Sequence, residues 1–404
     1  MTAMRCDIAV VGEGIVGLSA AIGLRLASAG ALRVVTIAPG PAAPDPRALA
    51  LVAGSRRQLE ALGAWAAIEP EAEPMRSIAI ADGKLADVAR PFLLGFDEET
   101  LPGEFFAHVA PTDAILSGLA ARAAELGVEH RTGRVVALET LPRGARLGLE
   151  DGSEAAATLV LAADGRQSSL RRMAGIVRQT WGYGQSALVV TVAHTHPHEG
   201  RAVQHFLPGG PFALLPMRGN RSGVVWSERE ELARRIAASP DEAFLAELSQ
   251  RAGGDLGRLT LAGPRGAFPL AGMIARSFVG ERLALVGDAA RVLHPIAGQG
   301  VNLGLRDAAA LVETVIEAAR LGLDFGRAEI LQRYQRWRRF ESAAFLAATD
   351  GLNRLFRIDD AGIRALRDLG LGLVERAPAA KRRFVEAAAG FGGAPPRLVM
   401  GEMP

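Results

Sequence analysis

Residues 282–307 read RLALVGDAARVLHPIAGQGVNLGLRD. The unbroken apolar run Leu283 to Val286 predicts a short strand that is buried on both faces. This run ends at Gly287-Asp288, so a carboxylate follows the carboxyl end of a strand, where open α/β sheets bind their ligands. Gly298-Gln299-Gly300 then opens an apolar-periodic segment that predicts a helix. The stretch therefore predicts a strand, a ligand-binding turn and a helix in direct succession.

The start of the predicted helix adds a second binding feature to this stretch. A helix N-terminus presents free N–H groups and about half a positive charge, and glycines let a ligand approach the backbone. Asp288 could thus hold hydroxyl groups while the amides near Gly300 to Asn302 hold an anionic group. A Gly-Asp pair alone is more often structural. The His294-Pro295 pair and the Gly-Gln-Gly segment that follow it favour a binding site.

The chain begins with a second glycine-rich turn. Asp7 to Val11 predicts a strand, GEGIVG follows at 12–17, and an Ala/Leu-rich helix runs to about Ala29 before another strand at 32–37. In this βαβ setting the pattern G-x-G-x-x-G predicts a dinucleotide site. Gly12 makes the turn, Gly14 lets a pyrophosphate reach the backbone, and Gly17 packs the helix on the strand.

Two features of this first unit depart from the usual dinucleotide pattern. The second strand should end in Asp or Glu for the adenosine ribose, but here it reads Thr36-Ile37-Ala38-Pro39. Glu13 also places a negative side chain inside the glycine motif, and we expect that side chain to point outward. The ribose contact must therefore come from elsewhere or be absent.

Two further segments carry candidate binding residues. The apolar run 158–163 predicts a buried strand that ends at Asp164-Gly165, with Ser168 as a plausible helix N-cap. Asp45 to Leu51 predicts the start of a helix that continues to Leu62. Arg47 in that segment could pair with a phosphate or be a surface arginine at a helix cap, and the sequence leaves both interpretations open.

Composition limits the classes of function. The chain has 404 residues, enough for two or three domains, and a net charge of +2, which gives no electrostatic case for nucleic acid. The single cysteine, Cys6, excludes an internal disulfide and a cysteine metal site. We interpret His194, His196 and His198 as a solvated loop, so no metal site is predicted. No signal peptide or spanning apolar run is evident, which favours a cytoplasmic protein.

The order and spacing of the three sites, at 12–17, 164–171 and 287–300, resemble those of the class A flavoprotein monooxygenases, which have the p-hydroxybenzoate hydroxylase fold. The resemblance covers nearly the whole chain. Finer features are similar to the ubiquinone-biosynthesis hydroxylase branch: DPRALAL at 45–51, LLPM at 214–217, LHPIAGQGVNLGLRD at 293–307 and TDGLNRLF at 349–356. The 293–307 run is the most specific of these.

The resemblance implies an α/β fold in three parts. A Rossmann-type FAD-binding domain would comprise 1–75, 101–180 and 265–350. An inserted antiparallel β-sheet domain for the substrate would comprise 76–100 and 181–264, and a helical C-terminal region 351–404. The implied FAD-binding residues are Gly12, Gly14, Gly17, Arg47, Asp164, Gly165, Gly287, Asp288, Pro295, Gly298, Gln299, Gly300, Val301 and Asn302.

The activity implied is that of an FAD-dependent aromatic hydroxylase. It would use NAD(P)H and O2 through a flavin C4a-hydroperoxide to hydroxylate a lipophilic substrate, a polyprenylated phenol of ubiquinone biosynthesis. NAD(P)H would act as a transient reductant without a second nucleotide-binding domain, since only one Rossmann fingerprint is present. The pocket candidates are apolar residues on predicted strands: Phe206, Leu214, Pro216 and Trp226. His294, Pro295 and His205 are the candidates for a catalytic role, and each also has an ordinary structural interpretation.

Two other classes of function stay open at this point. The same fold could serve a flavin-dependent reductase or epoxidase of an isoprenoid lipid. It could also serve a flavoprotein scaffold subunit of a membrane-associated biosynthetic complex, with a basic docking surface at Arg364, Arg367, Arg376, Lys381, Arg382 and Arg383. Peripheral contact with the inner face of the cell membrane and oligomer formation are compatible with both.

Overall fold

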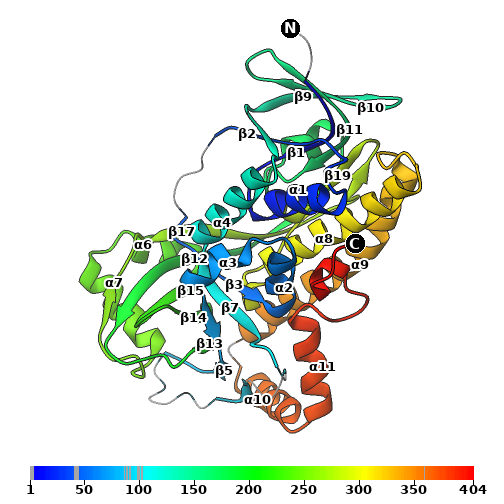
Figure 1. Cartoon of the computed structure of the whole chain (residues 1–404). Helices are drawn as coiled ribbons and strands as arrows, with labels where there is room; N and C mark the ends of the chain where they lie inside the picture. Colours follow the sequence, from blue (N-terminus) through cyan, green and yellow to red (C-terminus); the bar gives the residue numbers. More distant parts are fainter. Residues whose placement is uncertain are drawn as a thin grey trace.

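The computed structural model describes residues 4–40, 45–85, 87, 90, 92–97, 101, 103–358 and 360–404. Two large sheets and one small sheet organise these residues, with helices packed around them (Figure 1). The architecture is the mixed α/β class that the sequence predicts.

The first large sheet contains the predicted Rossmann strands, in the order β18-β19-β11-β1-β2-β8. Its strands are β1 (Met4–Val11), β2 (Val34–Ala38), β8 (Glu129–Thr132), β9 (Val135–Leu141), β10 (Gly144–Leu149), β11 (Glu154–Ala162), β18 (Val279–Gly280) and β19 (Leu283–Leu285). Val11 pairs in parallel with Ala162, and Ala162 pairs in parallel with Leu285. The turns that follow these three strands, at Gly12, Asp164 and Gly287, therefore meet at one edge of the sheet.

Helices cover this sheet and form the main core with it. They are α1 (Ile15–Ala27), α4 (Thr112–Glu125), α5 (Ser169–Met173), α8 (Gln299–Arg320) and α9 (Ala328–Phe356). Helices α1 and α8 approach closely, because a side chain at Gly23 would come within 3.0 Å of Val312. The strands are apolar on both faces for this reason, and Ile8, Val10 and Leu161 are completely buried.

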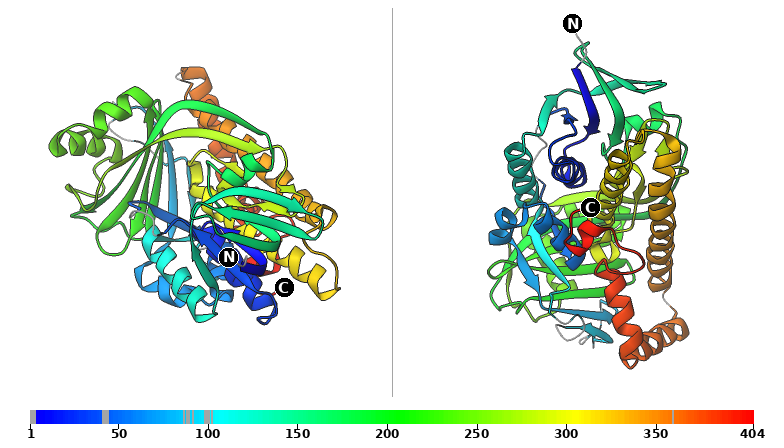
Figure 2. Two further views of the ribbon diagram at one scale, coloured as in Figure 1. Left: turned by 90° about the horizontal axis from the view of Figure 1, so that it is seen from above. Right: turned by 45° about the vertical axis from the view of Figure 1, so that its right-hand side comes forward.

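The second large sheet is mostly antiparallel and curves away from the first (Figure 2). It has the order β20-β17-β12-β15-β14-β13-β5-β6, and β16 also pairs with β12. Its strands are β5 (Ser77–Asp82), β6 (Leu94–Phe96), β12 (Arg178–His194), β13 (Arg201–Leu207), β14 (Gly210–Met217), β15 (Arg221–Arg229), β16 (Leu259–Leu261), β17 (Gly266–Ala275) and β20 (Arg291–Val292). Because β17 and β20 belong to it, this sheet extends past the boundary at residue 264 that we proposed.

Each face of the second sheet has its own cover. Helices α6 (Glu230–Ala237) and α7 (Asp241–Ala252) pack on one face. The other face meets a small sheet of β3 (Ala48–Val52), β7 (Ala107–Pro111) and β4 (Glu73–Met75). The helix predicted from Asp45 was therefore wrong over 48–52, since these residues pair antiparallel with β7 and the helix α2 (Ala53–Ala61) begins only afterwards.

The remaining helices include α3 (Trp65–Ile68), α10 (Ala361–Glu375) and α11 (Pro378–Ala388), with short 3-10 turns η1 (Glu69–Glu71), η3 (Gly287–Ala289), η4 (Ile296–Gly298) and η5 (Arg397–Met400). Helix α9 links the two large sheets. Its Tyr334 hydroxyl donates to the Leu285 carbonyl (2.7 Å), and its Asn353 amide donates to Gln185 Oε1 on β12 (3.1 Å). Among the described residues no helix combines the length and apolar character needed to cross a bilayer.

Candidate functional site

The first glycine motif fits tightly at two positions and leaves space at the third. Gly12 has φ +112°, and a Cβ there would lie 2.3 Å from the Ala163 carbonyl oxygen. A Cβ at Gly17 would lie 2.0 Å from the Gly12 oxygen, whereas no atom comes within 4 Å of one at Gly14. No side chain caps α1. The N-terminus of α1 thus faces open space, which is what a pyrophosphate requires.

A cavity of about 1360 Å³ begins at this motif. It runs along the end of β2 to α4 and reaches the turn after β11. Its lining includes Gly14, Thr36, Leu116, Asp164 and Gly165. Apolar walls with a few polar groups are typical of cofactor sites, and the cavity is large enough for the nucleotide half of a dinucleotide cofactor.

Asp164 anchors the turn after β11 with one carboxylate oxygen, and its other carboxylate oxygen has no hydrogen-bond partner among the described residues. Its Oδ2 accepts from the amides of Ser169 (2.8 Å) and Leu170 (3.2 Å) at the start of α5. Its Oδ1 is buried without a hydrogen-bond partner among the described residues. The Ser168 hydroxyl accepts from the Arg171 amide at 3.0 Å, which confirms the predicted N-cap. A ligand hydroxyl would satisfy the free Oδ1.

Asp288 lies in η3, in the turn after β19 at the same sheet edge. Its side chain is accessible to solvent, yet enough protein surrounds it that burial raises the pKa of its carboxyl, against the opposing charges of Arg291, Arg47 and Arg166. No described residue donates a hydrogen bond to this carboxylate. A carboxylate that is deeply placed, accessible and unpartnered fits a site for ligand hydroxyls.

Arg47 already has a carboxylate partner. Its guanidinium forms hydrogen bonds of 2.8 and 2.9 Å with Asp45, and these bonds raise the pKa of Arg47. The Asp288 charge also raises the pKa of Arg47, so Arg47 lies close to Asp288. The arginine is half exposed, which leaves both of the interpretations drawn from the sequence open.

The start of α8 presents free backbone amides. Gly298 has a left-handed conformation (φ +60°), no side chain caps the helix, and no atom lies within 4 Å of a Cβ built at Gly300. The Asn302 side chain is occupied elsewhere, since it donates to the Ala50 carbonyl (2.9 Å) and accepts from the Val52 amide (3.1 Å). This pairing holds β3 against α8 and leaves the backbone of 299–302 free for a ligand.

His294 precedes this helix start and is almost fully buried. Its Nδ1 faces the Ile296 amide at 3.4 Å, and its Nε2 has no partner among the described residues. Burial lowers the pKa of His294 to about 4, and the Arg357 charge adds to this effect. The Tyr183 ring meets it edge-on at 4.9 Å. The imidazole is therefore neutral near pH 7. Pro295, which follows it, is half-buried and precedes η4.

The sheet residues proposed for the substrate pocket divide between two faces. Leu214 and Trp226 pack with Phe244 under α6 and α7, and Pro216 shares their face because side chains alternate along a strand. The pocket role predicted for these three residues does not agree with this placement. Phe206 points to the other face, where it stacks on Phe356 with ring centroids 3.8 Å apart.

The face toward α8 has its own apolar residues. Leu215 packs there with Ala48 and Val52, and Ala213 and Val225 occupy equivalent alternating positions. These residues, which the sequence analysis missed, are partly exposed and take the place of Leu214 and Trp226 as pocket candidates. Both alternating sets are apolar, so hydrophobicity alone could not distinguish them.

His205 lies on the face covered by α6 and α7. Its ring meets Phe212 edge-on, and its Nδ1 is 3.3 Å from Arg90 Nη1. Burial lowers the pKa of His205 to about 4. Its predicted role in phenol deprotonation is not compatible with this position, because the residue faces away from the start of α8.

Asp307 fixes the Gly287-Asp288 turn, a role that was not predicted from the sequence. Its carboxylate is completely buried, accepts from the Gly287 amide (3.1 Å), and pairs with Arg338 (2.9 Å) and Arg291. Asp307 lies five residues after Asn302 on the buried face of α8. A carboxylate at a buried position of the predicted helix is the signal that could have identified it. The Gly287-Asp288 turn is therefore fixed by a buried ion network.

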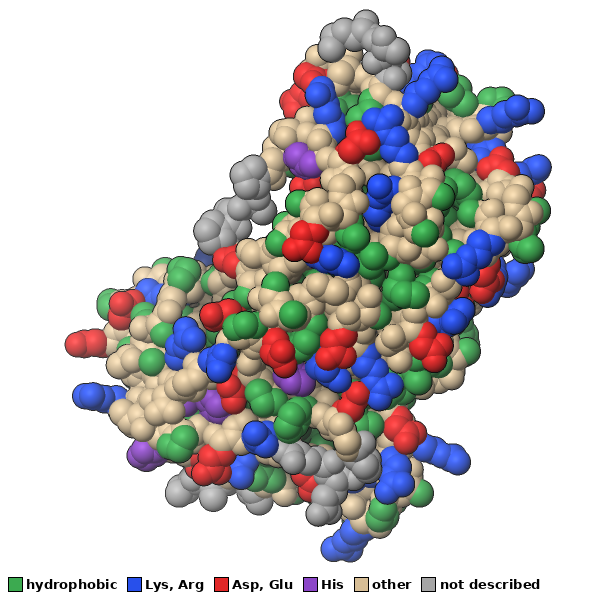
Figure 3. Space-filling view, viewed as in Figure 1, with side chains coloured by type: hydrophobic (Ala, Val, Ile, Leu, Met, Phe, Trp, Pro, Cys, Tyr) green, Lys and Arg blue, Asp and Glu red, His purple; other side chains and the backbone are tan. Residues whose placement is uncertain are grey.

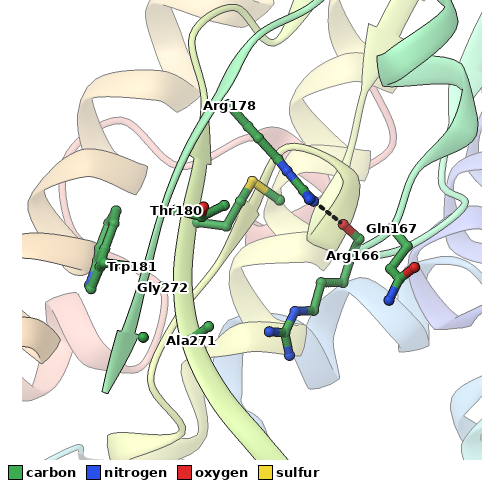
Figure 4. A pocket seen from close by; sticks show the side chains of 9 residues that line it. Arg166, Gln167, Arg178, Thr180, Trp181, Ala271 and Gly272 are labelled. Atoms are coloured by element: carbon green, nitrogen blue, oxygen red, sulfur yellow. Dashed lines mark hydrogen bonds between the residues drawn. The ribbon is translucent and has the colours of Figure 1, made fainter. Parts of the chain in front are cut away.

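A second pocket of about 390 Å³ adjoins the Asp164 turn (Figure 4). Arg166 and Arg178 extend into it from two segments, and Arg178 Nη1 donates to the Arg166 carbonyl (3.3 Å). Trp181 and Gly272 also belong to its lining. Two guanidinium groups suit an anionic ligand. In the part of the chain that is described, no group of three metal-ligating side chains converges.

Known proteins share the sequence and the fold of this chain. A family model described as an FAD binding domain matches residues 5–349. The chain belongs to this FAD-binding family. The flavoprotein is 40% identical to the ubiquinone hydroxylase UbiL of Rhodospirillum rubrum, over 98% of this chain and 92% of that protein. It is 32% identical to the 3-demethoxyubiquinol 3-hydroxylase of Escherichia coli, over 97% and 100% of the two chains.

Solved structures agree on the fold of this flavoprotein. The p-nitrophenol 4-monooxygenase PnpA from Pseudomonas putida superposes with a TM-score of 0.80 at 20% identity, over 95% of this chain and 98% of that one. An HpxO variant from Klebsiella pneumoniae in complex with FAD gives 0.74 at 20% identity, over 94% and 98%. The flavoprotein is thus an FAD-dependent monooxygenase with the p-hydroxybenzoate hydroxylase type of fold, and it is similar to ubiquinone hydroxylases.

Proposed function

We propose that this monooxygenase hydroxylates the ring of a polyprenylated phenol in ubiquinone biosynthesis. A ring C–H becomes C–OH with one atom of O2. The other oxygen atom takes the hydride equivalent of NAD(P)H and one proton and leaves as water, while NAD(P)⁺ forms. The names of the relatives support the pathway. One observation carries the proposal. Asp288 and the uncapped start of α8 lie together beside the apolar face of the second sheet that is turned toward α8.

The residues of the chain would divide this task. FAD, when bound, supplies the redox chemistry and oxygen activation. Asp288 would accept the ribityl hydroxyls, and the amides of 299–302 would stabilise negative charge at the ring edge. Leu215, Val225 and the Phe206–Phe356 stack would exclude water from the reacting atoms. We assign the Arg166–Arg178 pocket to the phosphates of NAD(P)H.

Labelled oxygen tests the hydroxylase. With a prenylated phenol, NAD(P)H and ¹⁸O2, we expect one labelled oxygen atom per product molecule and faster NAD(P)H oxidation than without the phenol. Mass spectrometry of the product is the measurement. A reduced product without label would indicate a reductase, and a labelled epoxide would indicate an epoxidase. The absence of turnover with any lipophilic phenol would indicate a scaffold subunit.

A surface on α10 and α11 supports contact with a membrane. Leu366, Leu369 and Leu373 are about two-thirds exposed at 68%, 60% and 59%, and their spacing places them on one side of α10. Phe384 on α11 is exposed next to Arg382 and Arg383. Apolar and basic side chains both reach the surface of this protruding region (Figures 1 and 3). We propose that it rests on an anionic bilayer, which would give a lipophilic substrate direct access.

Flotation with vesicles tests this contact. The protein should float with vesicles that contain anionic lipid and less so with neutral ones, because the arginines add electrostatic attraction to apolar insertion. Leu369→Glu with Leu373→Glu should abolish flotation. Leu321→Glu, at an equally exposed leucine after α8, is the matched control and should float normally. Wild-type protein that stays with the unbound fraction at low salt would contradict the proposal.

A further inference from the structure

Glu13 does not point outward as we expected from the sequence. Its Oε1 accepts a hydrogen bond from the Thr36 hydroxyl on β2 (2.5 Å) and lies 2.5 Å from His130 Nδ1 on β8. Thr36 and His130 are directly paired in the parallel ladder of these strands. The carboxylate of the glycine motif is thus turned along the sheet edge, toward the end of β2.

The Glu13 carboxylate thus lies near the end of β2, where the usual dinucleotide pattern has an acidic residue and this chain has none. Thr36 and Ala38 are two residues apart, so their side chains share one face of β2. A carboxylate bonded to Thr36 therefore occupies the face on which residue 38 would present an acid. Glu13, Thr36 and Ala38 all line the large cavity. Among the described residues no donor reaches Glu13 Oε2, and the side chain is 27% exposed.

We propose that Glu13 accepts the hydroxyls of the adenosine ribose of FAD, in place of the acid that the second strand lacks. A carboxylate suits two neighbouring hydroxyls because each can donate a charge-assisted hydrogen bond to it. Thr36 and His130 hold Oε1, and Oε2 keeps no protein donor among the described residues, so it can accept from a ligand in the cavity that Glu13 lines. The inference rests on FAD binding alone and is independent of the substrate.

Titration of the apoprotein with flavins tests the role of Glu13. Glu13→Ala should raise the Kd for FAD by about ten- to a hundredfold, the usual effect of losing hydrogen bonds to a charged group. FMN has no adenosine, so its Kd should not change. Flavin fluorescence measures both constants without any turnover. Unchanged or tighter FAD binding would overturn the proposal, since it would mean that the carboxylate is neutral or repels the pyrophosphate.

A relocated carboxylate provides the matched control. In Glu13→Ala with Ala38→Glu, an acid returns to the same face of β2, and the affinity for FAD should recover. A loss of FAD that Ala38→Glu does not correct, or an equal loss of FAD and FMN, would assign Glu13 a purely structural role. If Glu13→Ala does not fold, Glu13→Gln keeps the acceptor for Thr36 and should weaken FAD binding specifically, by a smaller factor. Wild-type protein without affinity for FAD would instead reject the function proposed above.

Discussion

Asp288→Ala should give a colourless, folded protein. The Asp288 carboxylate would be the acceptor for the ribityl hydroxyls, and hydrogen bonds to a charged group are each worth about 1.5–3 kcal/mol. Loss of two of them should weaken FAD binding by about a hundredfold or more. The visible absorbance of the flavin, compared with that of wild-type protein at equal protein concentration, measures the retained cofactor.

The fold should survive this change, which separates binding from stability. No described residue donates a hydrogen bond to Asp288, and burial raises the pKa of its carboxyl, so the charged side chain does not stabilise the apoprotein at pH 7. The apoprotein of Asp288→Ala should therefore unfold at the same denaturant concentration as wild type, or at a higher one. Asp288→Asn keeps one acceptor and should retain part of the flavin. A yellow Asp288→Ala protein with one FAD per chain would reject the assignment.

Asp307→Ala should lower the free energy of unfolding by about 3–5 kcal/mol, the usual cost of removing one partner from a buried ion network. The substitution leaves the guanidinium groups of Arg291 and Arg338 buried without their carboxylate, and Arg338 has no exposed surface. The Gly287 amide loses its acceptor as well. Urea denaturation of the apoprotein measures the change.

Glu317→Ala is the matched control for this network. Glu317 pairs with Arg333 on the surface, where both side chains are more than 40% exposed. Loss of an exposed pair costs at most about 1 kcal/mol. Equal effects of the two substitutions would mean that Asp307 does not hold the Gly287-Asp288 turn. A shifted loop should also release FAD, so we expect Asp307→Ala to be pale even where it is folded.

The sequence predicted the strand–turn–helix units because their signals are local. At Gly12 and Gly17 the backbone leaves no space for a side chain, and such positions accept only glycine. The carboxyl ends of β1, β11 and β19 meet because parallel strands are aligned, so three distant motifs could be assigned to one edge.

Other features depend on partners far away in the chain. Ala48 to Val52 became a strand because residues 107–111 pair with it, and nothing near residue 48 indicates that partner. The direction of Glu13 depends on Thr36 and on His130, which is 117 positions away. The sequence also could not show which side chains of the second sheet face α8, because the side chains on both of its faces are apolar.

Helix α9 spans 29 residues, or about 43 Å at 1.5 Å per residue. Near one end Tyr334 bonds to Leu285 on β19, and at the other end Asn353 and Phe356 contact Gln185 and Phe206 of the second large sheet. The length of α9 therefore sets the distance between the proposed flavin site and the second large sheet. Removing one residue from its middle would turn one end by about 100° against the other. Insertions or deletions within α9 preserve the contacts at both of its ends only when they come close to a whole number of helical turns.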